Sequence, residues 1–415
     1  MLATPLMCCG FRPFFLGAAL WGAGALLLWM GMLSGALPMS VAPLGGPVWH
    51  AHEMVWGFGM AAVTGFLLTA VPEFTATPAF APRDTAWLLA FWLAARAFGL
   101  LGLAGLDGLA QVWLMALPNL ALVLWLGARI APRLLVQPDR PHLGFGLAVA
   151  ALALLEAGFW WDAVQGQADM RWVNALVGVM MVLIVLAQSR ISMRLLHGML
   201  DHLGVHEADY RAPPPRRGLA IFGIALVTAA ELLGTSTPTL GWLALATAAA
   251  VLALMTDWHF GRALLHRWVW PLYAVYVGMA AGFALMGLAW LGAPWAPSAG
   301  RHLLTVGSMG LAVLAVMNIA GRIHAGRALD DRRWRLVATG LLVLAALARA
   351  VSAMPVAGVA MLAWWWVAAL AWVVAWLLFA VFAWQHLVGP RLDGGTGCEE
   401  ALGNGIPAAS SSCKH

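Results

Sequence analysis

Charged residues are scarce in this sequence. They make up 10% of the 415 residues, whereas hydrophobic residues make up 62%. A soluble protein carries about 25% charged residues, and a soluble domain with so few could not cover its surface with polar groups. The shortage excludes a soluble enzyme, a disordered protein and a nucleic-acid-binding protein, so no nucleic acid partner is expected.

The sequence contains many long runs of apolar residues. A membrane-crossing helix needs about 20 mostly apolar residues, and the runs are too long and continuous for the strands of a membrane barrel. The sequence therefore predicts an all-α, polytopic integral membrane bundle of about 12 transmembrane helices. The predicted spans are Pro13–Leu33, Val48–Val71, Thr85–Leu103, Leu109–Ile130, Leu143–Trp161, Trp172–Leu195, Gly218–Leu233, Leu240–Thr256, Val269–Leu291, His302–Ile319, Leu336–Ser352 and Val356–Ala383.

The positive charges are distributed unequally between the loops. With twelve spans, nearly all Arg and Lys side chains fall on the side that holds both termini; only Arg171 and Arg301 fall on the other side, and Arg96 and Arg349 lie within spans. The positive-inside rule then makes both termini cytoplasmic. The N-terminus lacks the pattern of a cleavable signal, so we expect a multi-pass protein of the bacterial inner membrane that keeps its first helix as an anchor.

The ends of the chain complete the expected organisation. Residues 1–392 form the predicted transmembrane domain, and residues 393–415, rich in Gly and Ser, form a predicted disordered cytoplasmic tail. All four cysteines, Cys8, Cys9, Cys398 and Cys413, fall on the cytoplasmic side. Because that compartment is reducing, structural disulfides are not expected. The sequence shows no clear internal repeat.

Eight ionisable residues that lie in or near the membrane-embedded part gather at one depth. A charge in the bilayer costs at least ~2.5 kcal/mol, so such residues usually mark function or a needed pair. The topology places all of them in the outer half, which predicts one polar site near the periplasmic face. They are His50, His52, Glu53, Arg96, Glu156, Glu231, His302 and Arg349. A simpler structural interpretation pairs the two arginines with Glu156 and Glu231.

The histidines favour a metal site, because neutral imidazole is the commonest metal ligand among side chains. His50 and His52 point about 200° apart on a regular helix, so they cannot bind one ion from it. Either residues 49–52 are partly unwound after Pro47, or the two histidines serve different centres. His324 lies a membrane thickness from His302 along one helix, so those two would belong to separate sites on opposite faces.

Four stretches of the chain resemble the NnrS family. Residues 47–74 read PVWHAHEMVWGFGMAAVTGFLLTAVPEF and follow FRPFF at 11–15; His302–Gly310 and His324–Leu329 resemble two further family motifs. The resemblance implies a polytopic bacterial membrane protein that carries haem and copper and is linked to nitric oxide and nitrosative stress. Tyr276 stands where the family frequently has a histidine.

The resemblance and the residues together give the expected site. His50, His52, His302 and His324 are predicted metal ligands for haem b and copper. Glu53 is predicted to orient a ligating imidazole or relay a proton, the alternative being a first-turn acid favoured by the helix dipole. The guanidinium groups of Arg96, Arg349 and Arg327 are candidates to neutralise haem propionates.

Several functions remain open at this stage. The protein would bind or reduce nitric oxide at an intramembrane metal site, and a nitric oxide reductase-like oxidoreductase would need electrons from a quinol or a periplasmic redox protein. The alternative is a secondary transporter that uses buried Glu, Arg and His for proton or substrate coupling. A third interpretation is a structural partner of a cytochrome complex, with helix packing through Gly278 and Gly282.

Overall fold

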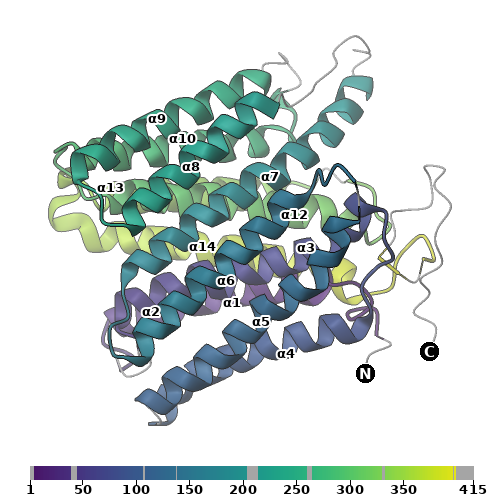
Figure 1. Cartoon of the computed structure of the whole chain (residues 1–415), viewed down its shortest axis with the longest axis horizontal. Coiled ribbons are helices and arrows are strands. Elements are labelled where there is room, and N and C mark those ends of the chain that lie inside the picture. The colour runs from purple at the N-terminus through teal and green to yellow at the C-terminus, as the bar shows by residue number, and fades with distance from the viewer. Residues whose placement is uncertain are drawn as a thin grey trace. The chain divides into compact units, whose positions relative to one another are not determined.

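A computed structural model describes residues 4–38, 44–105, 108–136, 138–202, 214–258, 264–329, 332–395 and 397–398, except for the side chains of 192–202 and 214. Within these ranges the chain consists of helices joined by turns and loops, and contains no strand (Figure 1). The predicted all-α fold class is confirmed.

The long α-helices follow one another along the chain. They are α1 (Phe11–Leu33), α3 (Met60–Thr75), α4 (Pro82–Gly99), α5 (Leu109–Leu135), α6 (Leu143–Val164), α7 (Met170–His202), α8 (Pro214–Leu232), α9 (Thr237–Met255), α10 (Trp270–Trp290), α12 (Gly310–Ile323), α13 (Trp334–Val351) and α14 (Met361–Val388).

Shorter helical segments interrupt this series. Two are the short α-helices α2 (Gly46–His52) and α11 (Ser298–His302), each of which runs directly into a π-helix, η2 (Glu53–Gly59) and η6 (Leu303–Met309) respectively. Three are 3₁₀-helices: η3 (Leu101–Ala104), η4 (Thr256–Trp258) and η7 (Pro355–Ala360).

Eleven helical segments among the described residues are long and apolar enough to cross a membrane. They coincide with the predicted spans except Gly218–Leu233, which corresponds to α8. That helix has 19 residues, but only the 13 residues between Arg217 and Glu231 are free of charge, fewer than the about 20 that a membrane-crossing helix needs. The predicted bundle is confirmed with α8 as the exception, whereas the side of the membrane on which the termini lie stays a prediction.

The chain divides into two compact units. Unit 1 comprises Met1–Val173, Met317–Arg332 and Trp376–His415, and unit 2 comprises Asn174–Val316 and Arg333–Ala375. Helices α7, α12 and α14 each contribute residues to both units. Each unit is therefore made of segments that are separated in the sequence.

Unit 1 is built around α1 and the interrupted helix α2–η2–α3. Helix α1 packs against both η2 and α3, while α5 packs against α3, α4 and α6. Aromatic side chains such as Phe14, Trp56 and Phe58 are fully buried at these contacts. The ring of Phe58 meets that of Trp376 edge to face, with 4.8 Å between centroids. This packing holds η2 inside the unit.

Unit 2 is built around α10. This helix packs against α9, α11 and η6, and α13 packs against α11 and η6. Two glycines of α10 face the interrupted helix: a Cβ on Gly278 would contact Ser308, and one on Gly282 would overlap Leu304. The Gly278–Gly282 pair therefore serves packing within this chain.

Candidate functional site

The site in unit 1 starts where α2 changes into a π-helix. Pro47 lies in the first turn of α2, where a proline costs no hydrogen bond, and the wider helix begins directly after His52. The indole Nε1 of Trp92 donates to the carbonyl oxygen of Gly57 at 2.8 Å. Gly57 must lack a side chain, because a Cβ would overlap Trp21 and Glu53. π-Helical turns of this kind frequently occur at functional sites.

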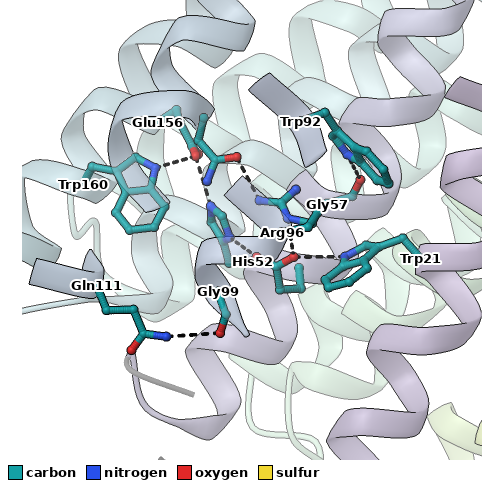
Figure 2. A network of polar contacts seen from close by, with 11 residues as sticks. Trp21, His52, Gly57, Trp92, Arg96, Gly99, Gln111, Glu156 and Trp160 are labelled. Atoms are coloured by element: carbon teal, nitrogen blue, oxygen red, sulfur yellow. Dashed lines mark hydrogen bonds and ion pairs between the residues drawn. The ribbon is translucent and has the colours of Figure 1, made fainter. Parts of the chain in front are cut away.

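His52 lies at the centre of a buried polar network (Figure 2). Its Nδ1 is 3.2 Å from Oε1 of Glu53, its Nε2 is 3.0 Å from Oε1 of Glu156, and its side chain is fully buried. An ionised carboxylate only accepts hydrogen bonds. A doubly protonated ring therefore satisfies both contacts, since it donates from each nitrogen.

Glu53 carries a second set of contacts. Its Oε2 is 2.9 Å from Nε of Arg96 and accepts a hydrogen bond from Nε1 of Trp21 at 3.0 Å. Nη2 of Arg96 donates to Oδ1 of Asn119 at 2.8 Å, so the guanidinium joins α4 to α5 as well as to η2. On the other side, Nε1 of Trp160 donates to Oε1 of Glu156 at 2.7 Å.

The formal charges of this network balance. With His52 doubly protonated, two carboxylates face one guanidinium and one imidazolium, and His52, Glu53, Arg96 and Glu156 are all buried. Isolated charges at this position would be strongly destabilising, whereas compensated and hydrogen-bonded ones are tolerated. The network therefore has the composition that a membrane-spanning unit requires if it is to keep ionised groups inside.

Some polar atoms of the network have no hydrogen-bond partner in the part of the chain that the structure describes. They are Oε2 of Glu156, Nη1 of Arg96 and Nδ2 of Asn119, all buried. Together they offer one acceptor and two donors. Buried atoms of this kind in proteins usually bind ordered water, an ion or a ligand, so the network has unused capacity to bind a small polar group.

The ion pairs differ from the simple pairing that the sequence suggested. Arg96 pairs with Glu53 and not with Glu156, while Glu231 pairs with Arg301 at 2.7 Å and accepts from Nδ2 of Asn174 at 3.1 Å. Arg349 donates instead to Oγ of Ser352 at 2.9 Å and lies over the ring of Trp365. That pairing interpretation was wrong, because other residues take the expected partners: Glu53 binds Arg96 and Arg301 binds Glu231.

The remaining candidate ligands have separate surroundings. α2 is α-helical from Gly46 to His52, so the unwinding of residues 49–52, one of the two alternatives, does not occur, and the two histidines lie on different faces. His50 stacks on Trp29, with ring centroids 5.0 Å apart. His302 lies in unit 2 and its Nδ1 is 2.7 Å from the carbonyl oxygen of Ser298.

His324 and Arg327 lie at the end of α12, within unit 1. Nδ1 of His324 is 3.0 Å from the carbonyl oxygen of Cys398, and its Nε2 is 3.6 Å from Oε2 of Glu73. Arg327 follows in the turn, where its backbone N–H donates to the carbonyl oxygen of Arg322. Among the described residues, no group of three or more His, Cys, Asp and Glu side chains forms a cluster for a metal ion, and the predicted ligand set stays a prediction.

The interrupted helix occurs twice. In each unit a short α-helix ends at a histidine, His52 or His302, and a π-helix of seven residues follows. The interrupted helices α2–η2–α3 and α11–η6–α12 are followed by α4 and α13, and each of these two helices carries an arginine in its last turn, Arg96 and Arg349 respectively. When the two histidines are aligned, Pro47, Gly57, Ala62 and Val63 match Pro297, Gly307, Ala312 and Val313.

This repeat was not recognised from the sequence, because the matches are single small residues separated by variable apolar ones. The alignment of the two interrupted helices also shows one difference between the units. The residue after the histidine is Glu53 in unit 1 and Leu303 in unit 2. The carboxylate that neutralises Arg96 therefore has no counterpart at the matching position of unit 2.

The fold and the site define a polytopic helical membrane protein with a charge-balanced network buried in one of its units. A family model described as "NnrS protein" matches residues 5–391. The chain belongs to the NnrS family. No curated protein matches this chain.

Three participants in the network were missed from the sequence. They are Trp21, Asn119 and Trp160. Two of them have a recognisable signal: Asn119 is a polar amide within the apolar run of α5, and Trp160 follows Glu156 by one helical turn. Trp21 gives no such signal, because tryptophan is common throughout this chain.

Proposed function

We propose that the protein binds haem b and copper in the bacterial inner membrane and binds nitric oxide there, with reduction of nitric oxide as the catalytic form of the same activity. Membership of the NnrS family is the observation that carries the proposal. Haem iron and copper, when bound, supply the ligand-binding and redox chemistry. The residues of the chain must then provide ligands for the metals, groups that compensate the charge of the haem propionates, and an apolar route by which nitric oxide reaches the site.

His302 and His324 fit the role of ligand. In each ring Nδ1 lies within hydrogen-bond distance of a backbone carbonyl oxygen, of Ser298 and of Cys398 respectively. Such a bond places the proton on Nδ1 and the lone pair on Nε2, which is the usual arrangement of a metal-ligating imidazole. In His324 the Nε2 also faces Oε2 of Glu73 at 3.6 Å, so ligation there would require this carboxylate to move. His50 stays in the proposed set as an imidazole held flat against Trp29.

His52 fits a different role. Ligation through either ring nitrogen requires one of its contacts with Glu53 and Glu156 to break. We therefore assign His52 to positioning: with the two carboxylates it joins α2 and η2 to α6 and fixes the start of the π-helix. Glu53 has the predicted contact with an imidazole and also holds Arg96.

The arginines divide in the same way. Arg96 is neutralised by Glu53 inside the protein, so it does not fit a haem propionate. Arg349 has no carboxylate partner among the residues that the structure describes, and contacts only Ser352 and Trp365. A guanidinium in this state fits a carboxylate brought by a ligand. Arg327 stays a further candidate on the side of His324.

The proposal is tested by the absorption spectrum and the copper content of the purified full-length protein. We expect a Soret absorption band, copper in metal analysis, and a shift of the band when nitric oxide is added. Turnover of nitric oxide with a quinol or a periplasmic redox protein as electron donor would establish the catalytic form. A protein that is colourless and free of copper after expression with haem and copper supplied contradicts the proposal.

A secondary transporter is the second candidate, favoured by the repeat of the interrupted helix. Transporters commonly consist of repeated units with discontinuous helices and buried ionisable groups at the midplane. The network of His52, Glu53, Arg96 and Glu156 has that composition. Proton-coupled uptake into vesicles by a metal-free preparation would support this function over the first.

A further inference from the structure

The chain after α14 folds back onto the end of unit 1. We call residues 389–395 and 397–398 the C-terminal strap. Nη1 of Arg12, a buried side chain at the start of α1, donates to the carbonyl oxygen of Gly389 at 2.6 Å. Asp393 lies against Gly326, whose φ is +66° and where a Cβ would overlap the carboxylate. The strap therefore packs against the start of α1 and the turn that follows α12.

The strap is also held together internally. Arg391 binds the carboxylate of Asp393 through Nε at 2.9 Å and Nη2 at 2.6 Å, and its Nη1 donates to the carbonyl oxygen of Gly397 at 3.1 Å. The Arg391 side chain is buried. These bonds give the described part of the predicted tail a defined conformation.

A disulfide closes the strap. Cys398 is joined to Cys9, with 5.1 Å between their Cα atoms and 389 residues between them in the sequence. The prediction that the cysteines form no disulfide was wrong for this pair, because the fold brings the two ends of the chain together. Cys8, the neighbour of Cys9, is a free thiol.

The closed strap covers a histidine. The carbonyl oxygen of Cys398 is 3.0 Å from Nδ1 of His324, and this imidazole is 6% exposed. Its Nε2 faces Glu73 at 3.6 Å. Because the last described residue of the strap both contacts His324 and carries the disulfide sulfur, release of the sulfur frees the residue that shields the imidazole.

We propose that Cys9 and Cys398 form a reversible thiol–disulfide site that fixes the C-terminal strap over His324. The charge distribution of the loops predicts a cytoplasmic location for this site, and protein disulfides in that compartment are usually transient and redox-sensing. The site does not depend on the proposed nitric oxide function.

The reaction partner is a small-molecule disulfide, R–S–S–R. Cys398 is more exposed than the buried Cys9, so its thiolate attacks the reagent first, forms a mixed disulfide and releases one RS⁻. The thiolate of Cys9 then attacks the Cys398 sulfur and releases the second RS⁻. Two electrons pass from the protein to the reagent and two protons pass to the solvent. A dithiol reductant reverses both steps.

The linkage is tested in the full-length chain with a protease site inserted within residues 204–213, between α7 and α8. After cleavage, Cys9 and Cys398 belong to different fragments. With glutathione disulfide as oxidant, the fragments should migrate together on a non-reducing gel and separate after reduction. Cys9→Ser and Cys398→Ser should separate under both conditions, whereas the matched controls Cys8→Ser and Cys413→Ser should behave as the wild type.

Coverage of His324 is tested separately by its reaction with diethyl pyrocarbonate, measured by mass spectrometry. We expect modification to be several-fold slower in the oxidised than in the reduced protein. In Cys398→Ser the rate should equal that of the reduced wild type with or without the oxidant. Fragments of the oxidised wild type that separate, or a His324 rate that does not change on oxidation, would overturn the proposal.

Discussion

His52 and Glu156 join α2 to α6 through a contact of 3.0 Å between Nε2 and Oε1. Both side chains are completely buried, and each has another partner in the same network, Glu53 for the imidazole and Trp160 for the carboxylate. Removing either member therefore leaves a buried charge without its compensation.

Glu156→Ala should be strongly destabilising. The loss of one partner of a buried ion pair costs about 3–5 kcal/mol, and here the imidazolium of His52 loses one of its two carboxylates. We expect a clearly lower melting temperature in detergent, followed by tryptophan fluorescence. Asp169→Ala is the control, because this carboxylate is about half exposed and lies 3.9 Å from Arg171. Equal melting temperatures for the two variants would contradict the assigned role of Glu156.

The pair of Glu53 and Arg96 should show coupling in a double-mutant cycle. Glu53→Gln and Arg96→Met each leave the other charge uncompensated, whereas the double variant removes both. For residues in direct contact the coupling energy is about 0.5–3 kcal/mol, so the double variant should be less destabilised than the sum of the single ones. Additive effects on the free energy of unfolding would show that the 2.9 Å contact contributes no interaction energy.

Gly57→Ala should disturb the π-helix. The added methyl group would overlap the side chains of Trp21 and Glu53, and overpacking of this kind costs about 1–3 kcal/mol. Gly24→Ala in α1 is the matched control, since nothing lies within 4 Å of a Cβ there. Lower thermal stability of Gly57→Ala alone supports the close approach at η2; similar stabilities would argue against it.

The C-terminal strap should lose a contact at low pH. Hydrogen bonds from Arg391 lower the pKa of Asp393 from 3.8 to about 2. Since the folded-state pKa lies below the ordinary value, the stabilisation is complete above about pH 4 and is lost as the pH falls through about 2. In the Cys398→Ser variant, pepsin should cut the strap faster as the pH is lowered over this interval.

The control for this pH dependence is Asp393→Asn combined with Cys398→Ser. An amide does not titrate in this range, so cleavage of the strap should be fast throughout and should follow only the activity of pepsin. The same pH profile in both proteins would contradict the role of the carboxylate.

Periodicity and hydropathy predicted the helices, because each apolar run is a local signal of sufficient length. The predicted topology also placed His52, Glu53, Arg96 and Glu156 among the candidate residues of one polar site. In the structure these four side chains lie together. Their partners could not be predicted: a choice between two acids for Arg96 depends on distances of a few ångströms between helices. The π-helix was missed for a related reason, since it depends on how Trp92 and Trp21 pack around Gly57.

The contact between the two ends of the chain could not be predicted from the sequence for a different reason. Cys9 and Cys398 are 389 residues apart, and nothing local to either cysteine indicates the other. The predicted cytoplasmic location of the cysteines argued against a bond, whereas the fold places both sulfurs at the same end of unit 1. The rule that cytoplasmic proteins lack structural disulfides holds on average. It does not take account of where the fold of a particular protein places two cysteines.

The most direct test of the account compares haem and copper content in two purified variants, His302→Ala and His52→Gln. The account makes His302 a ligand and gives His52 a positioning role between two carboxylates. It therefore predicts that His302→Ala loses haem or copper, while the folded fraction of His52→Gln keeps both and still shifts its Soret band with nitric oxide. Full metal and haem content in His302→Ala, with loss confined to His52→Gln, would contradict it.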